Sequence, residues 1–139
     1  MINVRDLMVG NLINTHDGVI VIGKIHRDSV ADKWGAIYFD DEIEPIPVTK
    51  EILNKIGFEE YEDLPLEGVF YRYWDKDCKY KLDVRDFWTN SKRKWYVHVD
   101  NDVCNTIGSG EFTYLHELMN LVRVISGYEL KIEKEIFYD

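Results

Sequence analysis

An aspartate-glycine pair between two apolar runs is the feature that most limits how this chain can fold. Asp17 and Gly18 both tolerate positive φ, and a run of β-branched residues follows them directly. Such a pair between two strands is the strongest local signal for a β-hairpin. The sequence therefore predicts antiparallel strands over residues 11–14 and 19–25. Gly23 interrupts the second strand, which indicates a bulge or a sharp bend.

The remainder of residues 1–58 predicts one more strand and a short helix. A polar turn over residues 27–33 leads to an apolar strand over residues 34–39, after which two prolines at alternate positions keep the chain extended. Thr49 is a good helix N-cap, and Gly57 is placed to end the helix in the left-handed conformation. These residues predict a bent, barrel-like antiparallel meander followed by a short helix.

A second antiparallel meander is predicted after residue 58. Acidic residues 59–67 indicate a loop at the seam between two halves, and strands are expected at 69–74, 78–85 and 95–99. The strand at 78–85 alternates apolar and charged side chains, which is typical of a sheet with one buried face and one face in water.

The most regular pattern in the chain is helical. Apolar residues recur at helical spacing from Tyr114 to Ile125, and Gly127 ends the helix. This amphipathic helix is expected to cover the second sheet, and the tail over residues 128–138 to add a last strand. The chain is therefore predicted to have an α+β fold, with residues 1–58 and 59–139 as two halves of one compact unit.

The charge of the chain argues against nucleic acids and lipid surfaces as partners. Its formal net charge is -9, so phosphate backbones and anionic membranes are repelled on average. No stretch of about 18 apolar residues occurs, the length that a membrane-spanning helix needs. Cys78 and Cys104 form no C-x-x-C pair and are too few for a disulfide framework, which favours reduced thiols. We expect a cytoplasmic protein with no membrane contact.

Sequence motifs for catalysis and for cofactors are incomplete. His116 begins a pattern like the zinc-protease helix motif, but Asn120 stands where the second histidine is required. The glycines around Ser109 lack the lysine of a phosphate-binding loop, and the acidic pairs are ordinary turn residues. We therefore expect no enzyme activity, no cofactor and no metal. The alternative is a thiol enzyme in which Cys104 uses His98 or His116 as its base.

Aromatic and basic side chains crowd the second predicted sheet and offer a candidate binding surface. Interleaved residues of these two kinds can stack and steer single-stranded nucleic acid, and exposed aromatics also serve protein contacts. Because strands place side chains on alternate faces, either both sets of rings are covered, one by the helix and one by the first half, or an outer set is exposed. The candidate binding residues are Tyr71, Tyr73, Trp88, Trp95, Lys92, Arg93 and Lys94.

A polar row lies on the helix opposite its apolar stripe. His116, Asn120 and Arg123 share this side of the helix. We expect them to have a structural role, in which they pin a neighbouring loop such as residues 100–110. Replacement of His116 by alanine should then lower the melting temperature, and an unchanged melting temperature would count against this role.

Three segments occur in an order that is typical of one protein family: Arg5 to Asn11, Ile43 to Phe58, and Tyr114 to Leu121 with its Ser126-Gly127 exit. Together they span most of the chain, and they resemble a family of small uncharacterised proteins of gut Bacteroidales, their phages and mobile elements. That family commonly carries a glutamine in its His-x-Leu-x-Asn helix, with aromatic residues after it, whereas this chain has Glu117, Met119, Leu121 and Val122. The resemblance implies a shared fold and a mobile-element origin, and it brings no catalytic residues with it.

These observations favour an accessory protein that is not an enzyme. It would bind another protein, or a second copy of itself, through exposed aromatic side chains of the second sheet. The first alternative is binding of single-stranded nucleic acid by the same side chains, which the net charge of -9 disfavours. The second alternative is the thiol-dependent enzyme at Cys104.

Overall fold

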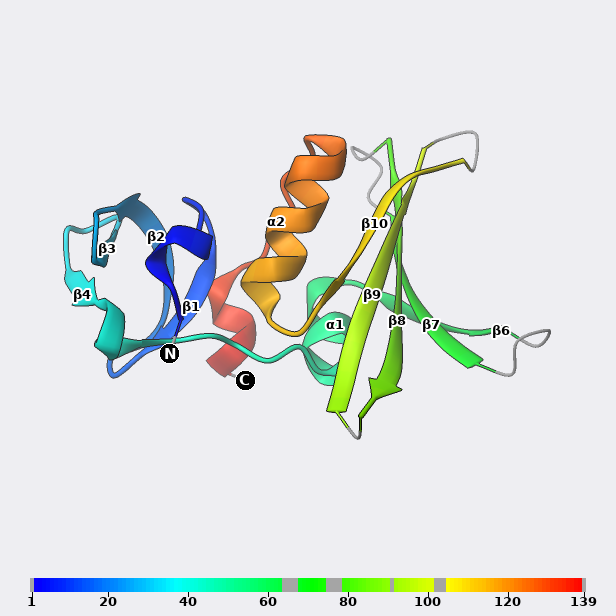
Figure 1. The fold of residues 1–139 in the computed structure, drawn as a ribbon, viewed down its shortest axis with the longest axis horizontal. Coiled ribbons are helices and arrows are strands. Elements are labelled where there is room, and N and C mark those ends of the chain that lie inside the picture. The colour runs from blue at the N-terminus through cyan, green and yellow to red at the C-terminus, as the bar shows by residue number, and fades with distance from the viewer. Residues whose placement is uncertain (1, 64–67, 75–78, 91, 102–104, 139) are drawn as a thin grey trace.

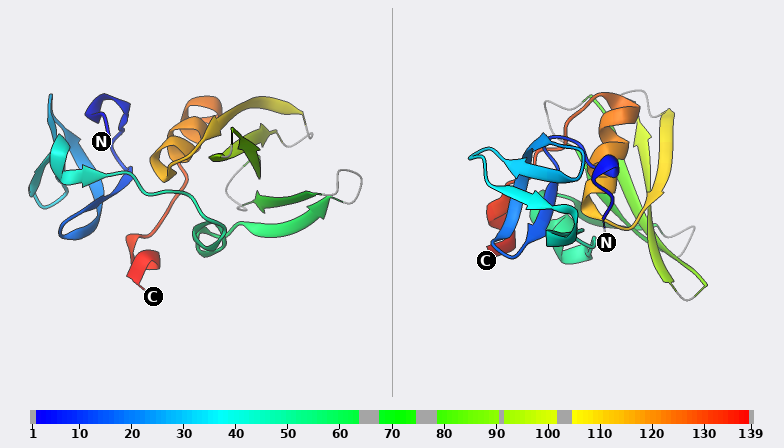
Figure 2. Two further views of the ribbon diagram at one scale, coloured as in Figure 1. Left: turned by 60° about the horizontal axis from the view of Figure 1, so that its bottom comes forward. Right: turned by 60° about the vertical axis from the view of Figure 1, so that its left-hand side comes forward.

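The chain folds into two five-stranded antiparallel sheets with helix α2 between them, as Figure 1 shows. The structure is a computed structural model, and it describes residues 2–63, 68–74, 79–90, 92–101 and 105–138. Figure 2 shows the arrangement from two further sides, with one sheet at each end of the molecule. This confirms the predicted α+β class, with an N-terminal meander, a second meander and a helix that covers the second meander.

The first sheet is open rather than closed into a barrel. Its strand order is β4-β3-β2-β1-β5, and its strands are β1 (Leu12–Thr15), β2 (Gly18–Ile25), β3 (Ser29–Asp32), β4 (Ile37–Phe39) and β5 (Ile43–Glu44). A short 3-10 turn, η2 (Asp40–Glu42), joins β4 to β5. Because β4 and β5 lie at opposite edges, the prediction of a barrel-like meander is corrected to an open sheet.

The predicted hairpin and its bulge are both present in the first sheet. Strands β1 and β2 pair from Thr15 opposite Gly18 onward, and Gly18 has a φ of 100°. The register between β2 and β3 shifts at Gly23, as a bulge requires. The prediction of a polar turn over residues 27–33 is wrong in part, because residues 29–32 form β3. Val30 is buried there, and its contribution to the core outweighs the turn-forming residues around it.

The second sheet is a simple meander. Its strands are β6 (Glu59–Asp63), β7 (Gly68–Tyr73), β8 (Lys81–Thr89), β9 (Lys92–Asp100) and β10 (Thr106–Phe112), and each pairs with the next along the chain. Two of these strands were not predicted. The acidic β6 was expected to be a loop, and it forms an edge strand whose charges reach water. The glycine-rich β10 was also expected to be irregular, and it forms the opposite edge.

The two helices begin and end where the sequence predicts. Helix α1 (Lys50–Ile56) starts at Thr49, whose side chain accepts a hydrogen bond from the Ile52 N–H. It ends at Gly57, and helix α2 (Leu115–Ser126) ends at Gly127, both with positive φ. Short 3-10 segments are η1 (Val4–Asp6) and η4 (Lys134–Tyr138). The last strand expected over residues 128–138 is therefore wrong, because η4 occupies the end of that segment.

The main hydrophobic core joins both halves of the chain. It includes Leu12 and Val19 from the first sheet, Leu53 from α1 and the inner face of the second sheet under α2. A smaller core lies on the other face of the first sheet. There Ile2, Val4 and Leu7 cover Ile13, Ile20, Ile22, Val30, Tyr38 and Ile43.

The C-terminal segment after α2 returns to the first sheet, as Figure 2 shows. Leu130 is buried in the main core. The Val19 N–H donates to the Tyr138 hydroxyl oxygen at 2.7 Å. On the other side of the segment, the Lys55 ammonium of α1 donates to the Ile136 carbonyl at 2.9 Å. This segment therefore ties α1 to β2.

Candidate interaction surface

The second sheet has an inner face under the helices and an outer face on the opposite side (Figure 1). Side chains alternate between these faces, so that Leu82, Val84, Val97 and Val99 point inward and are buried. The outer face is covered by no element in the part of the chain that the structure describes. Its side chains are half-buried against one another, and several remain accessible.

The aromatic residues that the sequence assigned to a binding surface lie mostly inside. Tyr71, Tyr73 and Trp95 are on the inner face, with exposed fractions of 5%, 9% and 2%. The Trp95 indole N–H donates to the Val48 carbonyl at 3.0 Å, and its ring meets Tyr71 edge-on. Their assignment to a binding surface is therefore wrong, because large rings contribute most to stability when α2 covers them. Trp88 pairs through its backbone in β8, and its side chain lies outside the described part of the structure.

A different set of side chains occupies the outer face, and the strand register places it in two rows. Each row takes one residue from each strand, from β6 to β10. The first row is Tyr61, Phe70, Arg85, Tyr96 and Glu111. The second row is Glu59, Arg72, Asp83, His98 and Ser109. We call these two rows, together with Phe87, the outer array.

Aromatic rings and guanidinium groups contact one another within the outer array. Tyr61 and Phe70 are stacked, with ring centroids 5.5 Å apart. The guanidinium groups of Arg72 and Arg85 lie 5.0 Å and 4.9 Å from the Phe70 ring centroid. Arg72 also donates to Asp83 at 2.8 Å, and this hydrogen bond raises the pKa of Arg72. These contacts hold the rings and guanidinium groups in fixed positions relative to one another.

The outer face carries no excess of negative charge. Its described charged side chains are five cations, Arg72, Lys81, Arg85, Lys92 and Lys94, and four carboxylates, Glu59, Asp83, Asp100 and Glu111. The chain as a whole carries a net charge of -9. The excess of negative charge therefore lies elsewhere, and the outer array is a place where an acidic partner would meet little repulsion.

The three basic candidate residues, Lys92, Arg93 and Lys94, are the first residues of β9, and two of them are neutralised by carboxylates. Arg93 pairs with Asp86 at 2.9 Å and lies over the Trp95 ring, while Lys94 pairs with Glu111 at 3.3 Å. Lys92 is exposed. The structure therefore brings Lys92, Arg93 and Lys94 together at one end of the sheet, where Arg93 packs against the Trp95 ring and Lys92 and Lys94 lie on the outer face.

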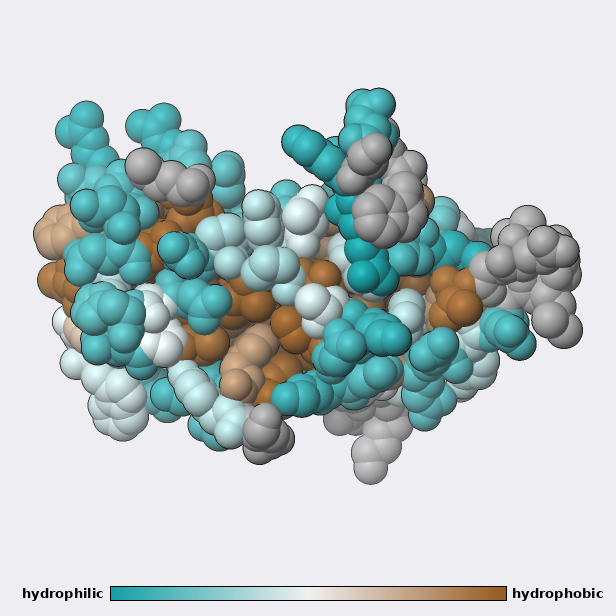
Figure 3. Space-filling model, turned by 90° about the horizontal axis from the view of Figure 1, so that it is seen from below, coloured by the Kyte–Doolittle hydropathy of each residue, from teal (hydrophilic) through white to brown (hydrophobic). Residues whose placement is uncertain are grey.

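A second apolar surface lies on the hairpin of β3 and β4. Trp34, Ile37 and Phe39 are exposed by 79%, 55% and 51%. Figure 3 shows apolar surface at the end of the molecule where the first sheet lies, next to hydrophilic side chains. The sequence predicts a strand over residues 34–39 but does not mark these side chains as exposed, and the strand that forms, β4, is limited to Ile37–Phe39.

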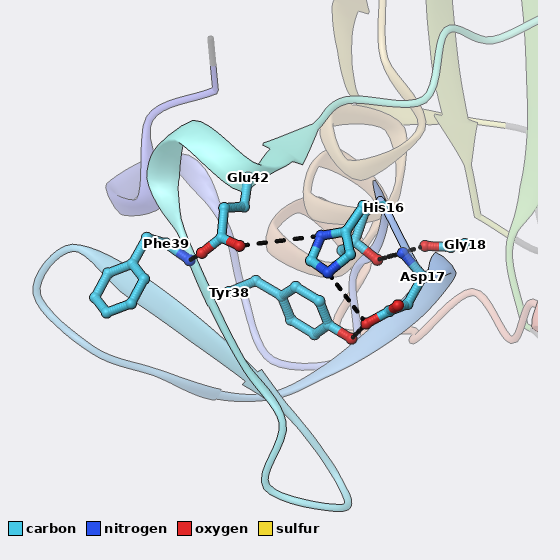
Figure 4. A network of polar contacts seen from close by, with 7 residues as sticks. His16, Asp17, Gly18, Tyr38, Phe39 and Glu42 are labelled. Atoms are coloured by element: carbon cyan, nitrogen blue, oxygen red, sulfur yellow. Dashed lines mark hydrogen bonds and ion pairs between the residues drawn. The ribbon is translucent and has the colours of Figure 1, made fainter.

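A polar network joins the first hairpin to η2, as Figure 4 shows. The Tyr38 hydroxyl donates to Asp17 at 2.8 Å, which raises the pKa of Tyr38. His16 lies 3.4 Å from Asp17 and 4.0 Å from Glu42, and Glu42 accepts a hydrogen bond from the Phe39 N–H. These contacts hold the turn between β1 and β2 against β4 and η2. Among the described residues, no group of three or more histidine, cysteine or acidic side chains could hold a metal.

The polar row of α2 pins a loop, but not the loop that the sequence predicted. Asn120 donates to the Asp6 carbonyl at 3.0 Å and accepts from the Asn11 amide at 2.9 Å. Arg123 donates to the Val9 carbonyl at 3.2 Å. The pinned segment is therefore residues 6–11, rather than 100–110, because this side of α2 faces the first half.

His116 is the exception in that row, because it makes no such contact. It is only 4% exposed, and its Nδ1 has no hydrogen-bond partner in the described part of the structure. Burial lowers the pKa of His116, so the neutral imidazole is favoured. The other proposed base, His98, packs against the Tyr96 ring on the outer face. Cys104 and Cys78 lie outside the described residues, so the arrangement of a thiol site is not seen.

Among the described residues, no helix is long and apolar enough to cross a membrane. Comparisons with protein-family models, with curated proteins and with solved structures find no match to this chain. The resemblance to the Bacteroidales family therefore rests on the three sequence segments alone.

Proposed function

We propose that this protein is a non-enzymatic binding module that contacts another protein through the outer array of its second sheet. The observation that carries this proposal is the array itself. Half-buried aromatic rings and arginines, aligned across five strands, form an uncovered sheet face that carries no excess of negative charge in a chain of net charge -9. Aromatic residues and arginine are the residue types most enriched at protein interfaces.

Binding of single-stranded nucleic acid is the weaker alternative. That function needs exposed rings beside cations that are available for phosphates. Three rings of the original candidate set are buried, and Arg72, Arg93 and Lys94 already pair with carboxylates. A protein partner requires no such excess of positive charge.

The test compares variants on the two exposed apolar surfaces. Tyr96→Ser and Phe70→Ser change the outer array, whereas Ile37→Ser removes a more exposed apolar side chain from the first sheet. Tagged proteins are used to capture partners from a native host lysate, with and without nuclease, and captured proteins are quantified by mass spectrometry. Thermal melting confirms that each variant is folded, and light scattering measures self-association.

The proposal predicts a captured protein, or a dimer, that is retained by Ile37→Ser and reduced at least tenfold by both outer-array variants. Capture that is abolished by nuclease would favour the nucleic-acid alternative. Capture that depends on Ile37 and is indifferent to Tyr96 and Phe70 would move the interface to the first sheet and overturn the proposal.

A further inference from the structure

We infer that the open edge of β10 is a second binding site, which takes up an extended segment of another protein as an additional strand. The segment that fits this edge alternates apolar and basic side chains. This inference does not depend on the aromatic rings of the outer array, because it uses the backbone at the β10 edge of the sheet rather than the rings on its face. Addition of a strand to a sheet edge is a common mode of peptide recognition.

The backbone at this edge points away from the sheet at defined residues. Thr113 follows β10 directly, and its carbonyl accepts a hydrogen bond from the Val48 N–H at 3.1 Å, on the side away from β9. Backbone groups of a strand point to alternate sides at successive residues. The N–H and C=O groups of Glu111 and Ser109 therefore point to the same side as those of Thr113, and they have no backbone partner there among the described residues.

The chain itself already adds an extended segment beside this edge. Val48 donates to Thr113, and Leu115 donates to the Ile46 carbonyl at 2.8 Å, with Pro47 opposite Tyr114 in an antiparallel bridge. These contacts end at Thr113, and the edge of β10 from Glu111 back to Ser109 has no strand beside it among the described residues. An incoming strand would lie in line with this segment and continue the same ladder.

The two edges of the second sheet differ in their protection. Natural sheets commonly blunt their edges with charged residues, which prevent pairing with other chains. At the β6 edge, four of the five residues are acidic, with the sequence EEYED. At the β10 edge, with the sequence TIGSGEF, the one carboxylate is that of Glu111, and it pairs with Lys94. The β10 edge is thus the one that can accept another strand.

Helix α2 supplies an apolar wall beside this edge. Gly108 and Gly110 have no side chains, and a Cβ on them would lie 2.5 Å from Ile125 and 2.8 Å from Leu121. The glycines therefore let α2 approach the edge strand closely, and Leu121 and Ile125 remain only partly buried. A strand added about 4.8 Å beyond β10 would place its inward side chains within reach of these two residues. Apolar side chains suit those positions.

The charge of this chain indicates which side chains the added segment would carry on the outer face of the sheet. Glu111 lies on the outer face of β10, and its side chain is 55% exposed. A second copy of this chain would bring another net charge of -9 to the contact, which disfavours pairing of two β10 edges. A segment with lysine or arginine at its outward positions is attracted instead by the net charge of -9, and its cations can share the Glu111 carboxylate with Lys94.

The first test uses a synthetic probe and reads the backbone contacts directly. A fluorescein-labelled heptapeptide that alternates valine and lysine is titrated with the full chain and followed by anisotropy. Two further versions carry N-methyl groups on one or the other alternate set of amides. We expect one methylated version to lose binding at least tenfold and the other to retain it, because only one set of amides faces β10. A valine-glutamate peptide should bind at least tenfold more weakly.

The matched variants are Ser109→Pro and Ser109→Ala. Proline removes the outward N–H of Ser109, while the ladder to β9 uses the neighbouring residues, so peptide affinity should fall at least tenfold with the fold intact. Ser109→Ala and the outer-array variant Phe70→Ser should bind the peptide as the parent chain does. This last variant separates the two proposals, because it is expected to lose partner capture without losing peptide binding.

Amide hydrogen exchange of the parent chain tests whether the peptide binds at the β10 edge, even where a variant fails to fold. Saturation with the valine-lysine peptide should slow exchange at Ser109 and Glu111 and leave Glu59 and Tyr61 of β6 unchanged. Equal loss of binding for both methylated peptides, protection confined to the outer-array residues of β6 to β9, or no protection would overturn the inference. Concentration-dependent dimerisation that Ser109→Pro abolishes would also overturn it, in favour of a second copy as the occupant.

Discussion

The two sheets have the same number of strands and the same antiparallel pairing, but they differ in what covers them. One face of the first sheet is covered by the N-terminal residues, and the other is covered by the main core except at β4, where Ile37 and Phe39 are exposed. The second sheet is covered on its inner face alone. The first sheet is therefore the more enclosed of the two, whereas the second leaves its whole outer face uncovered among the described residues.

The difference is also visible in where aromatic residues lie. On the second sheet, neighbouring positions along a strand send one ring into the core and the next to the outer array, as Trp95 and Tyr96 do. The two kinds of ring therefore predict opposite responses to substitution. Substitution of core rings should affect stability, whereas the proposed function predicts that substitution of outer rings affects binding.

The largest expected effect compares those two neighbours. Trp95→Ala should lower the free energy of unfolding by about 3–5 kcal/mol, because it removes a fully buried side chain and its hydrogen bond to Val48. Tyr96→Ala should cost about 1 kcal/mol or less, since the ring is partly exposed. Urea unfolding of the two variants measures both values. Similar losses would contradict the division into a core face and a binding face.

A smaller effect is expected where the C-terminal segment meets the first sheet. Gly18→Ala should destabilise the chain by about 2–3 kcal/mol, because the residue has a φ of 100° and the new Cβ would clash with the Tyr138 hydroxyl. Tyr138→Phe removes that oxygen. Gly18→Ala should therefore lower the free energy of unfolding by less in the Tyr138→Phe background than in the parent chain. If the two changes in unfolding free energy simply add, the Tyr138 hydroxyl does not contact the new Cβ.

Asn120→Ala tests the contact between α2 and residues 6–11. We expect a loss of about 1–2 kcal/mol, because the buried Asn11 amide is left without its acceptor. Val124→Ala serves as the control on the same helix, because Val124 is 76% exposed and should change stability by less than about 0.5 kcal/mol. Thermal or urea unfolding distinguishes the two variants, and equal stability would refute the pinning role.

The smallest effect concerns the pH dependence of stability. Burial lowers the pKa of His116 below 6.5 in the folded chain, although Glu117 and Asp6 oppose this change. The unfolded chain therefore binds the proton more readily as the pH falls below 6.5, and stability decreases in that range. Well above pH 6.5 the imidazole is neutral in both the folded and the unfolded chain, so its protonation no longer lowers the free energy of unfolding.

His116→Gln should remove this part of the pH dependence. The difference in unfolding free energy between the variant and the parent chain should shrink between pH 7 and pH 5, by no more than about 1 kcal/mol. Urea unfolding at several pH values measures the trend. A constant difference over this range would show that the imidazole titrates alike in the folded and unfolded chains.

Local signals in the sequence were sufficient for the elements that depend on local chemistry. The Asp17-Gly18 hairpin, the bulge at Gly23 and the ends of both helices were predicted correctly, because each depends on residues close in the chain. Strands β6 and β10 were missed for the opposite reason. Their carboxylates and glycines are poor strand formers, and pairing with β7 and β9 together with the approach of α2 stabilises them.

The candidate surface was predicted as a region but not as a set of residues. The alternation at 78–85 already places Leu82 and Val84 inside and Arg85 outside. The partners of Arg85 across the sheet, Phe70 and Tyr96, follow only from the register. The register depends on turns that the sequence does not define to a single residue, and a shift by one residue exchanges the two faces.

The return of the C-terminal segment to the first sheet has a consequence for dissecting this protein. Each half contributes side chains to one core, and residues 130–138 of the second half contact β2 and α1 of the first. Fragments divided after residue 58 would each expose apolar surface and would recover their shape only by complementation. Such fragments could report an interaction between two other proteins. Each of those proteins would be fused to one fragment, and their association would bring the fragments together and restore the fold.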